Sequence, residues 1–193
     1  MARNTTIETL HQAMLKSGAF VALLFIIEAV DLFLMAISHS TASRLALYGI
    51  VPRTLGGLPG ILFSPLLHAS AAHLLANALP LFILLTVLFW DRHYYPAETL
   101  ALIWLGSGIG TWLIGRSHSV HVGASGLIYG LVTYFIVAGC LMGRWRAVIA
   151  AVLVLIFYGG IFFGVLPQAG PISWEGHLSG AIAGLWVAHR NHG

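Results

Sequence analysis

The chain has 193 residues, of which 59% are hydrophobic and only 8% are charged, against about 25% charged residues in an ordinary soluble protein. So few polar residues cannot cover a water-facing surface, which excludes most soluble folds and indicates an integral membrane protein. The net charge is +3 without a cluster of Lys or Arg, so we expect no nucleic-acid partner. Cys140 is the single cysteine, which excludes an intrachain disulfide and a cysteine-based zinc site.

Six apolar stretches are long enough to cross a bilayer, which requires about 20 mostly apolar residues. They lie at about residues 17 to 37, 71 to 90, 97 to 115, 124 to 142, 147 to 166 and 174 to 189. We therefore predict an all-α membrane protein. Its parts are a cytoplasmic tail over residues 1 to 16, a six-helix domain over residues 17 to 190 and a short tail over residues 191 to 193.

The first apolar stretch carries two acidic residues, Glu28 and Asp31. It is too long for the core of a signal peptide, so we expect it to be retained. Carboxylates inside a membrane are costly, and we interpret this pair as satisfying neighbouring helix groups. A contact with polar groups of a functional site is the alternative.

A long first loop, about residues 38 to 70, connects the first two stretches. It alternates helix breakers such as Pro52 and Pro59 with apolar residues such as Leu62 and Phe63. This composition is typical of a loop that lies partly in the membrane interface.

The basic residues indicate an orientation, because Lys and Arg near the ends of spans prefer the cytoplasm. With the N-terminus inside, the cytoplasmic residues are Arg3, Lys16, Arg92, Arg144, Arg146 and Arg190, and the outer ones are Arg44, Arg53 and Arg116. We therefore expect both termini in the cytoplasm and the first, third and fifth loops outside. A bacterial cytoplasmic membrane is the expected location, because the chain shows no Arg- and Ser-rich presequence.

Three of the predicted helices begin at the outer side with polar residues, which are usually functional inside a membrane. The second begins near His68, His73 and Asn77, the fourth at Ser125 and the sixth at His177. A histidine within hydrogen-bond reach can take the proton of a serine and make its oxygen a nucleophile. We predict Ser125 as the nucleophile and His177 as the general base of a dyad.

A carboxylate that would orient His177 is not evident from the sequence. Glu175 lies two residues before it and would point to a different side of a helix. His73 and Asn77 lie one turn apart on one helix face, and both can donate hydrogen bonds to an oxyanion. Taken singly, His73 also fits a capped helix start or a lipid contact, and Asn77 fits an ordinary hydrogen bond between helices.

Glycines four residues apart indicate where helices approach closely. Gly126 and Gly130 follow Ser125, and Gly176, Gly180 and Gly184 surround His177. We therefore expect the serine-bearing and histidine-bearing helices to touch. Such rows are common in membrane proteins, so by themselves they indicate helix contact and not function.

Taken together, these elements resemble the rhomboid intramembrane serine proteases, over roughly residues 45 to 189. The resemblance rests on Gly123-Ala124-Ser125-Gly126, on Tyr129, on Gly176-His177 with Gly180 and Gly184, and on the earlier His68, His73 and Asn77. It implies a six-helix core in which the short serine-bearing helix starts below the outer surface, so that the active site opens to the outer side. It also implies lateral substrate entry beside the second and fifth helices, with the fifth loop, about residues 166 to 173, as a cap.

The resemblance assigns a role to each matching residue. Ser125 would be the nucleophile and His177 the base, and His73 and Asn77 would stabilise the oxyanion together with the backbone amide of Ser125. Tyr129 would pack against His177. His68, Gly123, Gly126 and Gly180 would be supporting residues.

The chain departs from the family in two places. The Trp-Arg pair of the first loop is absent, and the sequence there reads Gly49-Ile50-Val51-Pro52-Arg53. A glutamate at the end of the second helix is replaced by Trp90-Asp91-Arg92. Both differences concern loop architecture and substrate preference more than catalysis.

The expected function is hydrolysis of peptide bonds in or near transmembrane segments of membrane proteins, through an acyl-enzyme and without cofactor or metal. The expected partners are such substrates and the lipid bilayer. The alternative is a non-catalytic rhomboid-like protein that binds membrane clients. A transporter or metal permease, prompted by the ten histidines, fits less well, because no zinc motif and no inverted repeat is evident.

Overall fold

The protein is described here by a computed structural model that covers residues 2–157, 163–168, 170 and 172–193. Within these residues the regular structure is helical, apart from one isolated β-bridge between Ile50 and His121. The predicted all-α class is therefore confirmed. The long helices are α1 (Ala2–Ile37), α3 (Ala71–Trp90), α4 (Pro96–Ile114), α5 (Ser125–Leu141), α6 (Trp145–Phe157) and α7 (Trp174–His192).

These six helices coincide with the six predicted apolar stretches, with two differences. Helix α1 begins at Ala2, so most of the expected N-terminal tail continues the first helix. The fifth stretch is described as α6 only to Phe157, and its residues 158–162 lie outside the described part of the chain.

Three helical segments of the described chain are long and apolar enough to cross a membrane: Leu10–Ile37, Ala71–Trp90 and Arg92–Ile114. Helix α5 has 17 residues, or about 25 Å at a rise of 1.5 Å per residue, which is shorter than a hydrocarbon core of about 30 Å. Helix α7 ends on His189, Arg190 and His192, which lower its hydropathy. The structure therefore supports three candidate spans where the sequence predicted six.

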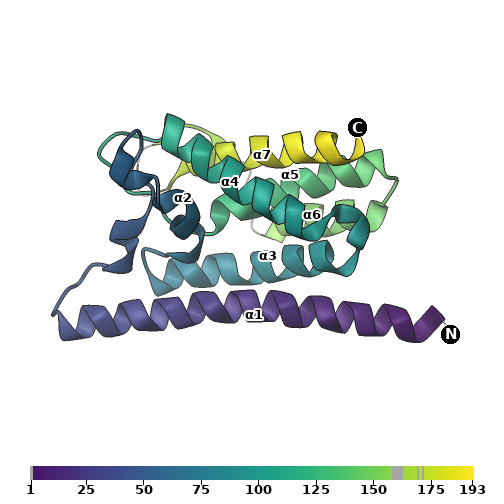
Figure 1. The fold of residues 1–193 in the computed structure, drawn as a ribbon, viewed down its shortest axis with the longest axis horizontal. Coiled ribbons are helices and arrows are strands. Elements are labelled where there is room, and N and C mark those ends of the chain that lie inside the picture. The colour runs from purple at the N-terminus through teal and green to yellow at the C-terminus, as the bar shows by residue number, and fades with distance from the viewer. Residues whose placement is uncertain (1, 158–162, 169, 171) are drawn as a thin grey trace.

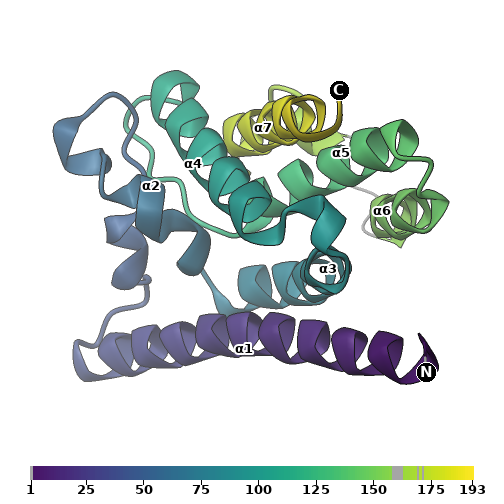
Figure 2. The ribbon, with the colours of Figure 1, turned by 45° about the vertical axis from the view of Figure 1, so that its right-hand side comes forward.

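Helix α5 is the central helix and contacts α3, α4, α6 and α7. Its side chains Leu127, Leu131, Tyr134, Phe135 and Ala138 are almost completely buried. Figures 1 and 2 show α1 running along α3 at one edge of the bundle, with α7 beside α4 and α5 at the opposite edge. The bundle is therefore built around the helix that Ser125 begins.

Helices α5 and α7 touch through their backbones at the predicted glycines. A Cβ atom on Gly180 would lie 2.0 Å from the carbonyl oxygen of Gly126, and one on Gly184 would lie 2.0 Å from that of Gly130. Only glycine permits this approach. The contact brings the helix of His177 against the helix of Ser125.

Replacing Gly180 with alanine is expected to lower the thermal stability of the detergent-solubilised protein. The added methyl group forces α7 away from α5, and overpacking of this kind costs about 1 to 3 kcal/mol. The midpoint of thermal unfolding measures the effect. Gly56→Ala is the control, because nothing lies within 4 Å of a Cβ atom there; equal midpoints for the two variants would contradict the close contact.

The first loop folds into short helical turns and is attached to α4. Its elements are η1 (Leu45–Tyr48), η2 (Leu55–Gly57), α2 (Gly60–Phe63) and η3 (Ser64–Leu66). The guanidinium of Arg53 donates to the carbonyl oxygens of Leu113 and Gly115, both at 2.8 Å, and the indole of Trp112 donates to the carbonyl oxygen of Thr54 at 2.9 Å. Arg53 and Trp112 thus fasten the loop although the Trp-Arg pair is absent.

Asp31 connects α1 to the start of the same loop. Its carboxylate accepts hydrogen bonds from the backbone amides of Arg44 and Leu45, both at 2.8 Å. This contact agrees with the interpretation that Asp31 satisfies neighbouring helix groups, because the two amides begin the short helix η1.

Candidate active site

The structure brings Ser125 and His177 into direct contact. Ser125 is the first residue of α5, and His177 lies in the first turn of α7. The Nε2 atom of His177 and the Oγ atom of Ser125 are 2.9 Å apart, although 52 positions separate the two residues in the chain. A serine and a histidine at this distance can exchange a proton.

Tyr129 lies one turn after Ser125 on α5 and supports the imidazole of His177. The two rings are stacked, with centroids 4.2 Å apart and planes inclined by 10°. Tyr129 is itself buried at 7% exposure. The stacking fixes the plane of the imidazole against a side chain of the serine-bearing helix.

The second nitrogen of His177 is bonded to the backbone. Its Nδ1 atom lies 2.9 Å from the carbonyl oxygen of Gly164, in the short helix η5 (Phe163–Val165). This partner could not be predicted from the sequence, because a backbone carbonyl is present at every residue and the segment carries no motif. Glu175 points elsewhere, as expected, and its carboxylate lies 2.8 Å from Nε of Arg116.

A cavity of about 750 Å³ exposes this pair of side chains. Ser125, His177, His73 and Asn77 all line it, so the four residues predicted to act in catalysis face one space. Ile172, in the expected cap, also lines it. Residues 169 and 171 of that cap lie outside the described part of the chain.

His73 lies directly against the backbone that precedes Ser125. A Cβ atom on Gly123 would lie 2.6 Å from Cε1 of His73, and Gly123 has a φ of +116°, which other residues rarely adopt. The amide of Gly123 donates to the carbonyl oxygen of Ser64 at 2.9 Å. The cap of α3 is Ser70, whose hydroxyl accepts from the amide of His73 at 3.2 Å, so the His73 side chain is not needed as a helix cap.

Asn77 is buried at 4% exposure, yet it borders the cavity. Its side-chain amide donates to the carbonyl oxygen of His73, one turn earlier, at 2.8 Å. An Asn amide has two N–H donors, so this bond leaves a second one. The backbone amide of Ser125 belongs to the first turn of α5, where N–H groups have no acceptor within their own helix.

His68 is buried at 3% exposure, against the backbone that leads to Ser125. Its Nε2 atom accepts a hydrogen bond from the amide of Ala124 at 3.5 Å, and its ring meets His73 edge to face with centroids 5.1 Å apart. Burial, aided by the charge of a protonated His73, lowers the pKa of His68 to about 3. His68 is therefore neutral near pH 7 and positions the residue before Ser125.

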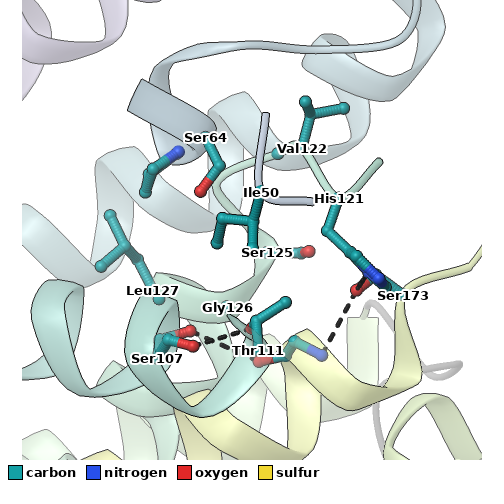
Figure 3. Close-up of a pocket in the computed structure, with 14 residues that line it drawn as sticks. Ile50, Ser64, Ser107, Thr111, His121, Val122, Ser125, Gly126, Leu127 and Ser173 are labelled. Carbon is teal, nitrogen blue, oxygen red and sulfur yellow. Dashed lines mark hydrogen bonds between the residues drawn. The ribbon is translucent and has the colours of Figure 1, made fainter. Parts of the chain in front are cut away.

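A small pocket of about 30 Å³ lies next to Ser125 and is shown in Figure 3. The polar residues that line it include Ser64, Ser107, Thr111 and His121. No sequence pattern connects these four residues with the site. The volume is sufficient for one water molecule, which needs about 10 to 15 Å³ by this measure and two to four polar partners. The pocket can thus hold a water molecule beside the serine.

The loop between α4 and α5 is tied to the start of α7. The backbone N–H of Arg116 donates to the carboxylate of Glu175 at 3.1 Å. The guanidinium of Arg116 donates to the carbonyl oxygens of Gly170 and Ile172, at 3.0 and 2.6 Å. The ring of His121 bonds to the hydroxyl of Ser173, the cap of α7, at 2.6 Å. These contacts join the loop before α5 to the segment before α7 beside the cavity, and sequence reasoning found none of them.

Comparison with known proteins adds three findings. The family model described as "Rhomboid domain" matches residues 56–191. Uncharacterized proteins of Mycobacterium tuberculosis and Mycobacterium bovis are each 40% identical to the chain over 181 residues, covering 88% of this chain and 71% of theirs. An uncharacterized Mycobacterium leprae protein is 36% identical over 178 residues, covering 88% and 68%. No solved structure matches the chain at a significant level.

Proposed function

This chain belongs to the rhomboid family, and we propose that it is an intramembrane serine endopeptidase that cleaves membrane proteins in or near their transmembrane segments. The observation that carries the proposal is the 2.9 Å contact between Ser125 Oγ and His177 Nε2 at the wall of an accessible cavity. A family resemblance alone does not establish activity. The proposed activity is supported by the contact of a serine hydroxyl with a histidine that can accept its proton.

In the proposed reaction, Ser125 attacks the carbonyl carbon of the scissile peptide bond while His177 accepts its proton. His177 then gives the proton to the leaving amine, and an acyl-enzyme on Ser125 remains. A water molecule, activated by the same histidine, hydrolyses the ester. The small pocket beside Ser125 offers a place for that water.

Three donors would stabilise the negative charge on the substrate oxygen: the Ser125 amide, the second N–H of Asn77 and the ring of His73. All three residues line the same cavity as the nucleophile. Donors aimed at such an oxygen act chiefly on the transition state. The supporting residues would keep these donors and the dyad in position; they are His68, Gly123, Gly126 and Gly180.

Replacing Asn77 with alanine is expected to lower kcat by about 100- to 1000-fold, as the loss of one oxyanion donor does. The value of KM should change much less, because the bond strengthens only as charge develops. Initial rates with a membrane-protein substrate in liposomes measure both constants. A rise in KM at unchanged kcat would instead assign Asn77 to substrate binding.

We further propose that all six long helices lie in the bilayer, with both termini cytoplasmic and the cavity opening outward. The three arginines that this orientation places outside are bonded within the chain: Arg44 donates to Ser38 at 3.1 Å, Arg53 binds carbonyl oxygens of α4, and Arg116 pairs with Glu175. The mycobacterial relatives support a bacterial membrane as the location.

The proposed substrates enter laterally beside α3 and α6, which contact each other at the side of the bundle. A peptide bond inside a regular helix is shielded by its backbone hydrogen bonds. We therefore expect preferred cleavage where helix-breaking residues unwind the substrate near the outer surface.

Labelling with a small fluorophosphonate probe tests the proposal without knowledge of the substrate. Detergent-solubilised wild-type protein should be labelled at Ser125, and Ser125→Ala should not be labelled at all. Absence of labelling in folded wild-type protein, together with retained binding of membrane clients, would favour the non-catalytic alternative.

A further inference from the structure

Among the residues that the structure describes, no carboxylate bonds to Nδ1 of His177, the place where a catalytic histidine usually has its orienting side chain. In serine hydrolases a carboxylate accepts from Nδ1–H and holds the imidazole in the correct tautomer. In this protein the nearest carboxylate along α7, Glu175, is bonded to Arg116. The position beside Nδ1 of His177 is taken by the carbonyl oxygen of Gly164, at 2.9 Å.

A carbonyl oxygen can only accept a hydrogen bond. The contact therefore requires that Nδ1 of His177 carry the proton and donate it to Gly164. In a neutral imidazole the other nitrogen, Nε2, then has a free lone pair. That lone pair faces Ser125 Oγ at 2.9 Å, which is the arrangement a general base needs.

The space around Gly164 admits no side chain. A Cβ atom there would lie 1.9 Å from Oη of Tyr129, 3.0 Å from Cζ of the same ring and 3.0 Å from Nδ1 of His177. Gly164 is not among the described glycines with positive φ, so its backbone conformation is open to other residues. Glycine is thus required for closeness to Tyr129 and His177 and not for conformation.

We propose that Gly164 is a positioning residue of the catalytic site, whose carbonyl oxygen holds His177 in the tautomer that accepts the proton of Ser125. The inference rests on the proposed function. It means that the third member of the catalytic group comes from η5, between α6 and α7, and not from the helices that carry the dyad. The group is complete only while η5 lies against Tyr129 and His177.

A double-mutant cycle between Gly164 and Tyr129 tests this role. The methyl group of an alanine at position 164 would clash first with Oη of Tyr129. Gly164→Ala is expected to lower the rate constant of fluorophosphonate labelling by about 10- to 100-fold, a part of the 10²- to 10⁴-fold effect of a general base. Tyr129→Phe removes Oη, the closest obstacle. In the Tyr129→Phe background the same glycine substitution should therefore cost much less, about threefold or below.

Gly56→Ala is the matched control, a loop glycine with open space around its Cβ position, and should label like wild type. Gly164→Ala labelling at the wild-type rate would overturn the inference and leave the proposed function intact. An equal loss in both Tyr129 backgrounds would overturn it too, because the effect would then not arise at this contact. A wild type that does not label would defeat the proposed function itself.

Ring ¹⁵N NMR of histidine-labelled protein gives a readout that does not depend on activity. The His177 signals are identified by their loss in His177→Ala. Wild-type protein near pH 7 should show His177 protonated at Nδ1, and Gly164→Ala should show a mixture of both tautomers. A wild-type His177 protonated at Nε2 would overturn the inference even if Gly164→Ala did not fold.

Discussion

Replacing His177 with alanine is expected to slow acylation of Ser125 by about 10²- to 10⁴-fold, which is the usual contribution of a positioned general base. Without the imidazole, the hydroxyl of Ser125 keeps its proton and is a weak nucleophile at neutral pH. The rate constant of fluorophosphonate labelling measures acylation directly. Cleavage of a membrane-protein substrate in liposomes should fall in parallel.

His189→Ala is the matched control for this prediction. His189 lies on the same helix, in its last turn, and is exposed at the end away from Ser125. It should label at the wild-type rate. In the proposed mechanism Ser125 and His177 act as a unit, so the double variant Ser125→Ala with His177→Ala should be no less active than Ser125→Ala alone. Full labelling of His177→Ala would remove His177 from the mechanism.

Replacing Arg116 with glutamine is expected to destabilise the protein by about 3 kcal/mol, the lower end of the range for breaking a buried ion pair. Glu175 is completely buried, and its carboxylate lies 2.8 Å from Nε of Arg116, whose side chain is 36% exposed. Removing the guanidinium leaves a buried negative charge without its partner. It also removes the bonds to the carbonyl oxygens of Gly170 and Ile172.

Thermal unfolding in detergent measures this effect, with a second ion pair as the control. Arg190 pairs with Glu98 on the surface, where both side chains are nearly half exposed, and Arg190→Gln should cost no more than about 1 kcal/mol. Adding Glu175→Gln to Arg116→Gln should recover part of the lost stability, because the unpaired charge is then gone. An Arg116→Gln variant as stable as Arg190→Gln would contradict a structural role of the pair.

Substitution of His177 should affect the reaction rate, whereas substitution of Arg116 should affect the stability of the protein. In the proposed mechanism His177 acts on the reacting atoms, so its loss should change rates and leave the unfolding midpoint nearly unchanged. Arg116 lies in the loop between α4 and α5 and holds this loop to the start of α7, so its loss should change stability first. The labelling rate of His177→Ala therefore tests the proposed catalytic role, and the unfolding midpoint of Arg116→Gln tests the structural role of the ion pair.

The sequence by itself determined the class of the protein and the dyad candidates. A charged fraction of 8% forces burial in lipid, and the family match confirms the predicted resemblance. Ser125 and His177 could be found because polar groups at the ends of apolar helices are costly and therefore informative. The glycine rows predicted the contact of α5 with α7, since a missing side chain is visible in the sequence.

Only the tertiary structure decided what holds these residues in place. The bond from His177 to Gly164 involves a backbone oxygen, and the pairing of Arg116 with Glu175 joins charges 59 positions apart. Attachment of the first loop through Arg53 likewise uses carbonyl oxygens of α4. Sequence patterns report which face of a helix is apolar or small, because that property repeats locally. Contacts between loops and backbone atoms follow no local period, so they emerge only when the helices are packed.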